Sequence, residues 1–124
     1  MENGTASFKP AGCSPSQRDS VRTHRTARVV SAFRKRHPDV RIFAIPNGEA
    51  RSRTTGARLK AEGVSAGVPD LFIPAWLVWI EMKRQRGGTV SPAQRDWHRY
   101  LASIGHTVIV ARGQEEAWRM LGDR

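Results

Sequence analysis

The most informative part of the chain reads GVPDLFIPAWLVWIEMK and covers residues 67–83. Residues 71–73 and 76–80 are apolar and rich in aromatic and β-branched side chains, and a Pro-Ala pair separates the two runs. Short apolar runs on either side of a turn are typical of two paired strands. This segment therefore predicts a β-hairpin whose second strand carries charge at Glu81 and Lys83.

The turn length decides whether three charged side chains of this hairpin share one face. Glu81 and Lys83 are two residues apart on a strand, so both leave the same face of the sheet. A four-residue turn at residues 74–77 places Asp70 directly opposite Glu81, with Cβ atoms about 5 Å apart. A two-residue turn shifts Asp70 opposite Trp79 but keeps it on the Glu81 face, whereas a three-residue turn moves it to the other face.

Two carboxylates so close together repel each other, and at the edge of an apolar sheet they require a counter-charge. Oxygen ligands from two strands suit Mg²⁺ or Mn²⁺, which take one or two carboxylates and leave the other positions to water and phosphate. Beside such an ion, Lys83 is able to donate to a phosphate, or to orient or deprotonate an attacking water. The combination favours metal-assisted hydrolysis of a phosphodiester, because a bound cation lowers the pKa of water and neutralises transition-state charge.

The overall charge points to a nucleic-acid partner. Lys and Arg number 21 against 11 Asp and Glu in 124 residues, which gives a net charge of +10. An excess of this size in a small chain favours a polyanion, with nucleic acid ahead of an anionic membrane surface. Hydrophobic residues make up 39% of the chain, which excludes a wholly disordered basic tail.

Length and composition predict one folded domain in the cytoplasm. We expect the domain to cover residues 18–124, after a flexible arm at residues 1–17 that mixes Gly, Ser, Pro and Thr without periodicity. No apolar run is long enough to span a membrane, and the N-terminal residues lack the order of a secretory signal. Cys13 is the single cysteine, so an internal disulfide is excluded.

The segments around the hairpin predict further helices and strands. Hydrophobic periodicity and turn residues indicate helices over residues 18–37, about 54–63, 91–105 and 114–121, and strands over 40–45 and 106–111. Helices that alternate with strands in this order favour an α/β fold with a mixed β-sheet flanked by α-helices.

The helix expected over residues 91–105 has a strong start signal. Ser91 is in the N-cap position, Pro92 follows it, and Gln94 is at the third helical position, which is the pattern of a capping box. Gln94 therefore has two interpretations, as a cap or as a polar group near the charged hairpin. The apolar side chains of this helix, at helical spacing, are Ala93, Trp97, Tyr100, Leu101 and Ile104.

Five ordered motifs resemble a known nuclease family. Pro69-Asp70, ten intervening residues and Glu81-Met82-Lys83 resemble the catalytic pattern of the PD-(D/E)XK nuclease superfamily, whose core is a restriction-endonuclease-like mixed sheet with flanking helices. Within that superfamily, the chain from about residue 38 to residue 121 is similar to the VRR-Nuc domain. The motifs that carry this resemblance are Ile45-Pro46-Asn47-Gly48, Ala57-Arg58-Leu59-Lys60-Ala61-Glu62-Gly63-Val64, Gly67-Val68-Pro69-Asp70-Leu71-Phe72, Ile80-Glu81-Met82-Lys83, and Ser91-Pro92-Ala93-Gln94 with Trp97.

The resemblance implies a role for each matching residue. Asp70 and Glu81 are implied metal ligands, the Met82 carbonyl a third ligand, Lys83 the catalytic lysine, and Gln94 a polar group of the catalytic site. The implied activity is a Mg²⁺- or Mn²⁺-dependent DNA endonuclease. Stand-alone bacterial and phage members are associated with homodimers that cut branched DNA such as four-way junctions. This implies a homodimer in the cytoplasm of a bacterial or phage-infected cell.

One departure from the family pattern leaves a second interpretation open. Family members usually place a Glu in the first helix, but the matching positions before the Asn47-Gly48 turn hold Arg22 and Arg25. Either Asp19 or Glu49 substitutes for it, or the metal has fewer protein ligands. The alternative function is a non-catalytic basic module with a nuclease-like fold that binds DNA. A ribonuclease is a third reading, because no residue visibly reads a 2′-hydroxyl.

Basic residues cluster in the predicted first helix, in residues 51–60 and after Lys83, where phosphate contact is expected. They are Arg22, Arg25, Arg28, Arg51, Arg53, Arg58, Lys60, Arg84 and Arg86. The histidines are scattered without metal-ligand spacing, and the sequence assigns no function to His24, His37, His98 or His106.

Overall fold

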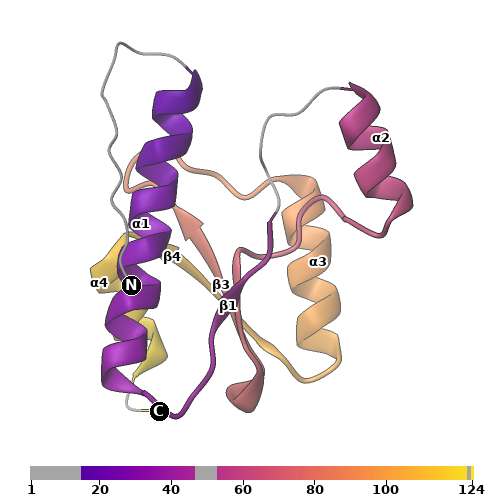
Figure 1. Cartoon of the computed structure of the whole chain (residues 1–124). Helices are drawn as coiled ribbons and strands as arrows, with labels where there is room; N and C mark the ends of the chain where they lie inside the picture. The colour runs from indigo at the N-terminus through magenta and orange to yellow at the C-terminus, as the bar shows by residue number, and fades with distance from the viewer. Residues whose placement is uncertain (1–14, 47–52, 123) are drawn as a thin grey trace.

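The computed structural model describes residues 15–46, 53–122 and 124, which form a four-stranded sheet with helices on both faces (Figure 1). The elements in chain order are α1 (Pro15–Arg36), β1 (Phe43–Ala44), α2 (Arg53–Ala61), β2 (Leu71–Ile73), the 3-10 turn η1 (Pro74–Trp76), β3 (Val78–Lys83), α3 (Pro92–Ser103), β4 (Thr107–Arg112) and α4 (Gln114–Leu121). The strand order is β1-β2-β3-β4, with the first two pairs antiparallel and the last parallel. The predicted mixed sheet with flanking helices is confirmed.

The hairpin of β2 and β3 has the four-residue turn. Ile73 pairs with Val78 and Leu71 with Ile80, so the register continues to bring Asp70 level with Glu81. Within the turn, Leu77 adopts a left-handed conformation with φ 55°, and its N–H donates to the carbonyl of Pro74 at 3.2 Å. The alternatives with two- and three-residue turns are therefore wrong.

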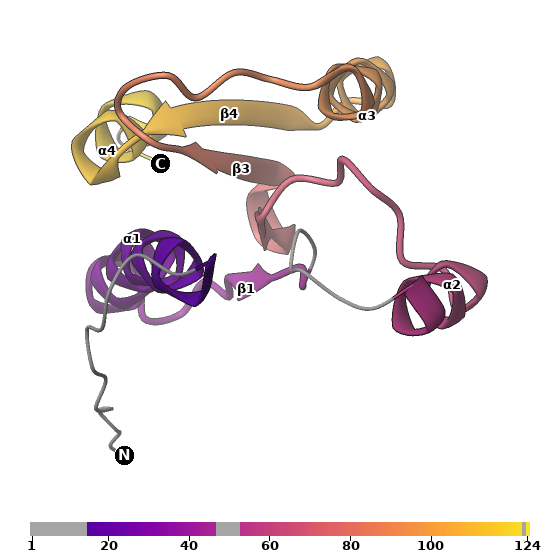
Figure 2. The same ribbon diagram turned by 90° about the horizontal axis from the view of Figure 1, so that it is seen from above.

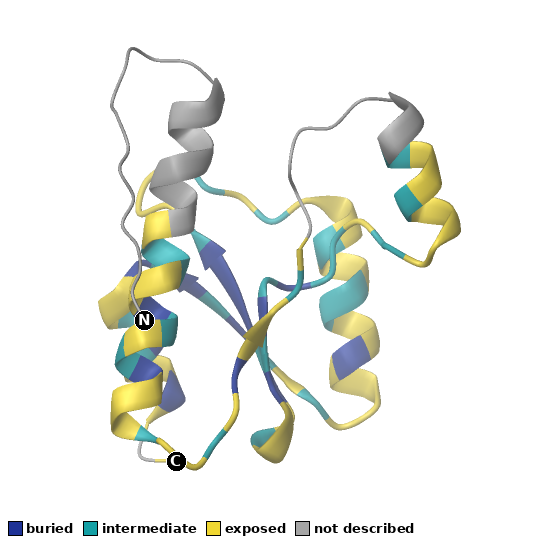
Figure 3. Cartoon of the chain, viewed as in Figure 1, coloured by how far each residue is buried: buried dark blue, intermediate teal, exposed yellow. Residues whose placement is uncertain are grey.

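The core lies between the sheet and the helices α1 and α4. Figure 2 shows α1 and α4 together on one face and α3 on the other, with α2 on the α3 side but standing away from the sheet. Val29 and Phe33 of α1 and Ala117 and Leu121 of α4 are buried against alternate residues of the strands. Figure 3 shows this buried layer along the strands and the inner sides of the two helices. Because strand side chains alternate, the charged hairpin residues point to the opposite face, under α3.

The apolar face predicted for α3 is mostly wrong. Leu101 is the buried residue of this helix, whereas Tyr100 is 55% exposed and Ile104 is 50% exposed. The strand beneath α3 explains this exposure. The Glu81 carboxylate of β3 points toward α3, and the polar side chains of Gln94 and His98 contact it. This end of the helix packs with polar side chains, and Tyr100 and Ile104 are left exposed.

Several element boundaries differ from the prediction. Helix α1 begins at Pro15, so residues 15–17 are its first turn instead of the end of a flexible arm, since proline is well suited to a first turn. The rest of that predicted arm and the Asn47-Gly48 turn lie outside the described residues. Trp76 belongs to η1 instead of a strand, and the predicted strand over 40–45 is reduced to β1. Strand β1 is short because only Phe43 and Ala44 pair with the three-residue strand β2.

A glycine fixes the approach of the chain to the hairpin. Gly67 has φ +94°, and a Cβ built on it would lie 2.6 Å from the carbonyl carbon and oxygen of Ala93, at the start of α3. We expect Gly67→Ala to lower the free energy of unfolding by more than the roughly 1–3 kcal/mol typical of backbone strain alone, because backbone atoms also clash. Urea unfolding followed by circular dichroism measures the loss. The matched control is Gly63→Ala, with φ +102° and no atom within 4 Å of the added Cβ. Equal losses in both variants would contradict the close contact.

Candidate functional site

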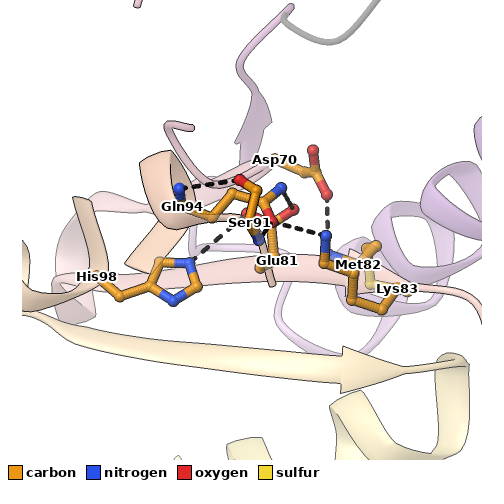
Figure 4. A network of polar contacts seen from close by, with 7 residues as sticks. All are labelled: Asp70, Glu81, Met82, Lys83, Ser91, Gln94 and His98. Atoms are coloured by element: carbon orange, nitrogen blue, oxygen red, sulfur yellow. Dashed lines mark hydrogen bonds and ion pairs between the residues drawn. The ribbon is translucent and has the colours of Figure 1, made fainter. Parts of the chain in front are cut away.

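The two hairpin acids lie close together at the carboxyl end of β3. Asp70 directly precedes β2, and its Oδ2 accepts a hydrogen bond of 2.8 Å from the backbone N–H of Met82. The N–H of Ile45 donates to the Asp70 carbonyl at 2.8 Å, which ties the backbone here to the end of β1. The Met82 side chain points into the core, so this residue offers only its backbone to the site. The structure thus brings Asp70, Glu81 and Met82 together, as the hairpin register predicts (Figure 4).

Glu81 is a buried carboxylate that contacts α3. Its side chain is 1% exposed, and among the described residues it is the one charged residue that is buried. Its Oε2 accepts a hydrogen bond of 3.2 Å from Gln94 Nε2, and its Oε1 lies 3.7 Å from His98 Nε2. Burial of a carboxylate is costly unless donors or a cation compensate it. A position of this kind is therefore typical of a functional group and not of a surface ion pair.

Gln94 fulfils both interpretations made from the sequence. Ser91 Oγ accepts from the Gln94 N–H at 3.2 Å and Gln94 Oε1 accepts from the Ser91 N–H at 2.9 Å, which is a complete capping box. The same Oε1 accepts a hydrogen bond of 2.8 Å from Lys83 Nζ, while Nε2 donates to Glu81. One amide therefore closes the first turn of α3 and joins Lys83 to Glu81. Gln94 thereby fixes the first turn of α3 relative to Lys83 and Glu81 of β3.

His98 is a member of this site that sequence reasoning missed. It follows Gln94 by one helical turn, so both side chains face β3. Burial lowers the pKa of His98, and the positive charge of Lys83 lowers it further, so the imidazole is neutral at neutral pH. Its contact with Glu81 is therefore not a salt bridge. The sequence signal for His98 is its spacing of four residues from Gln94, which puts both side chains on one face of the helix.

The donor set suits a hard divalent cation. Asp70, Glu81 and the Met82 carbonyl supply oxygen from neighbouring strands, and Mg²⁺ commonly takes one or two carboxylates with water and phosphate in its other positions. Within residues 15–46, 53–122 and 124, no group of three or more His, Cys, Asp and Glu side chains forms a metal site. The two acids that the sequence offers as a further ligand, Asp19 and Glu49, fall where side chains are not described. The described donors thus fit a metal held largely by water and substrate.

The predicted phosphate-binding residues lie on three segments. Arg28 is exposed on α1, Arg58 and Lys60 are exposed on α2, and Arg84 and Arg86 are exposed directly after β3. Arg25 differs from them because it is partly buried, and its Nε makes no hydrogen bond within the described part of the chain. The side chains of the other three predicted contacts, Arg22, Arg51 and Arg53, lie outside the described set. Among the described helices, none is long and apolar enough to cross a membrane.

The sheet order and the flanking helices define an α/β domain, and its similarity to a solved structure supports a nuclease-like fold. A solved structure described as a "VRR_NUC domain protein" superposes on this chain with a TM-score of 0.64 and 26% sequence identity, over 83% of this chain and 83% of that chain. The sequence matches no protein-family profile and no curated protein. The chain therefore has a VRR-Nuc-like fold, as its sequence motifs predict.

Proposed function

We propose that this protein is a Mg²⁺- or Mn²⁺-dependent endonuclease that hydrolyses phosphodiester bonds in branched DNA and acts as a homodimer. The observation that carries the proposal is the hairpin register, which sets Asp70 against the Met82 backbone beside the buried Glu81 carboxylate. Lys83, on the same face as Glu81, lies within hydrogen-bond distance of Gln94, which also contacts Glu81. Two acids able to hold a cation, with an amine and an amide beside them on one face, suit metal-assisted hydrolysis.

The roles follow from the chemistry of each group. Asp70, Glu81 and the Met82 carbonyl would hold the cation, which lowers the pKa of a water and neutralises charge on the phosphate. Lys83 carries three N–H donors, so its amine is able to stabilise a phosphate oxygen or to orient the attacking water. Gln94 holds the Lys83 amine through Oε1 and the Glu81 carboxylate through Nε2, which fixes their relative position.

The exposed cations support DNA as the substrate. Arg58 and Lys60 are on a helix that stands away from the sheet on the side of α3, and Arg84 and Arg86 directly follow the strand of Glu81 and Lys83. Contacts from such residues to phosphates position a duplex without reading its bases. Selectivity for DNA shape, and the homodimer, are supported by the resemblance to stand-alone enzymes that cut branched DNA.

The test is a cleavage panel with labelled linear, flap, bubble and four-way-junction DNA, and with the junction made as RNA. We expect cleavage of the branched DNA with Mg²⁺ or Mn²⁺ and none in excess EDTA, because the proposed chemistry needs the cation. Addition of Mn²⁺ after the chelator is the control that separates metal loss from inactivation. Undiminished cutting in EDTA would refute the proposal. If the cation changes neither the DNA product nor the melting temperature of the protein, the protein is the non-catalytic DNA-binding module instead.

A further inference from the structure

The structure gives one carboxylate two contacts from successive turns of the same helix. Gln94 Nε2 donates to Glu81 Oε2 at 3.2 Å, and His98 Nε2 lies 3.7 Å from Glu81 Oε1 (Figure 4). The two oxygens of Glu81 are thus each faced by a nitrogen of α3. The sequence resemblance assigns a role to Gln94 and none to His98.

The contact between His98 Nε2 and Glu81 Oε1 is close enough to shorten into a hydrogen bond. His98 Nε2 is buried and makes no hydrogen bond within the described residues. Buried side-chain nitrogens in folded proteins normally have a partner. The distance to Glu81 Oε1 exceeds the usual N–H···O range by less than 1 Å, which a small rotation of either side chain removes. No other described acceptor is recorded within hydrogen-bond distance of this nitrogen, so Glu81 is the acceptor that its geometry selects.

We propose that His98 is a positioning residue that donates its Nε2–H to Glu81 Oε1 and, with Gln94, holds this carboxylate in one orientation for the divalent cation. This inference rests on the proposed function. A carboxylate held at both oxygens cannot rotate about its terminal bond, so its remaining lone pairs keep a fixed direction. Neighbours of this kind around a metal ligand typically change metal affinity or activity by 10- to 100-fold when they are removed.

The experiment measures Mn²⁺ binding by isothermal titration calorimetry on the full chain, without DNA, next to kcat and KM for junction cleavage. We expect His98→Ala to weaken Mn²⁺ affinity by about 10-fold or more and to lower kcat more than it raises KM. His98→Gln is expected to restore most of the affinity, because its amide N–H reaches the position of the imidazole Nε2. Arg99→Ala is the matched control, since Arg99 is the exposed next residue of α3 and loss of its charge does not weaken cation binding.

The outcomes separate this inference from the proposed function. If the wild-type chain binds Mn²⁺ and cuts DNA but His98→Ala binds Mn²⁺ equally well, only the role of His98 is refuted. If both His98 variants lose affinity to the same extent, an N–H donor is not sufficient and the positioning role is also refuted. A wild-type chain that neither binds Mn²⁺ nor cuts overturns the proposed function and this inference together. Melting temperatures of the metal-free variants identify any loss that comes from unfolding.

Discussion

Replacement of Lys83 by alanine is expected to slow DNA cleavage by about 10²- to 10³-fold, the effect of removing one charge-stabilising donor from an active site. Lys83 Nζ is held by Gln94 Oε1 on the same face as Glu81. Under the proposed function, its loss would remove a fixed positive charge from beside the reacting phosphate. Asp70→Ala removes an implied metal ligand and the acceptor for the Met82 N–H. We expect it to reduce the cleavage rate at least as much as Lys83→Ala does.

The measurement is the single-turnover rate on junction DNA at saturating protein, together with the binding constant in Ca²⁺ or EDTA. DNA binding is expected to change little, because the exposed cations proposed to contact phosphates remain in place. Matched controls are Lys35→Ala and Asp39→Ala, which remove an exposed lysine and an exposed aspartate outside the site. A Lys83→Ala protein that binds DNA and cleaves it at the wild-type rate would exclude the proposed role of this amine.

Replacement of Phe33 by alanine is expected to lower the free energy of unfolding by about 3–5 kcal/mol, the usual effect of truncating a buried aromatic side chain. Phe33 is 0% exposed, and its ring lies 5.4 Å from the Trp76 ring and 6.5 Å from the Trp118 ring. It joins α1 to the hairpin turn and to α4. Because small domains are stable by only about 5–15 kcal/mol, the variant should be close to unfolding at room temperature.

Equilibrium urea unfolding, followed by tryptophan fluorescence and far-UV circular dichroism, gives the loss for Phe33→Ala. The control is Phe43→Ala, at an edge-strand position that is 45% exposed, where a smaller loss is expected. Equal losses of unfolding free energy at the two positions would contradict the larger contribution expected from the buried Phe33 side chain.

The hairpin and its charged face were predictable because both follow from local rules. Apolar runs and a turn proline locate the strands, and strand alternation puts Glu81 and Lys83 on one face. The sequence alone left the turn length open, and the structure selects the four-residue form because Leu77 adopts the left-handed conformation at its end. The start of α3 was predictable for the same reason, since Ser91 and Gln94 form a capping box within four residues.

Features that depend on contacts between distant segments were not predictable in this way. Hydrophobic periodicity assigned Tyr100 and Ile104 to the packed face of α3, because it carries no information about the strand beneath the helix. His98 was overlooked for the same reason, as its partner Glu81 precedes it by seventeen residues and lies on another element. Strand β1 was overestimated because its length is set by the residues of β2 that pair with it.

The double use of Gln94 restricts which side chains can make both sets of contacts. In most capping boxes glutamate and glutamine exchange freely, because either side chain accepts from the backbone N–H at the helix start. Here the same side chain also donates to Glu81, and a carboxylate has no hydrogen to donate. A glutamate at position 94 would set a second carboxylate against Glu81, so glutamate and glutamine are not equivalent here. A Gln94→Glu substitution would keep the capping box of α3 but replace the hydrogen bond to Glu81 with repulsion between two carboxylates.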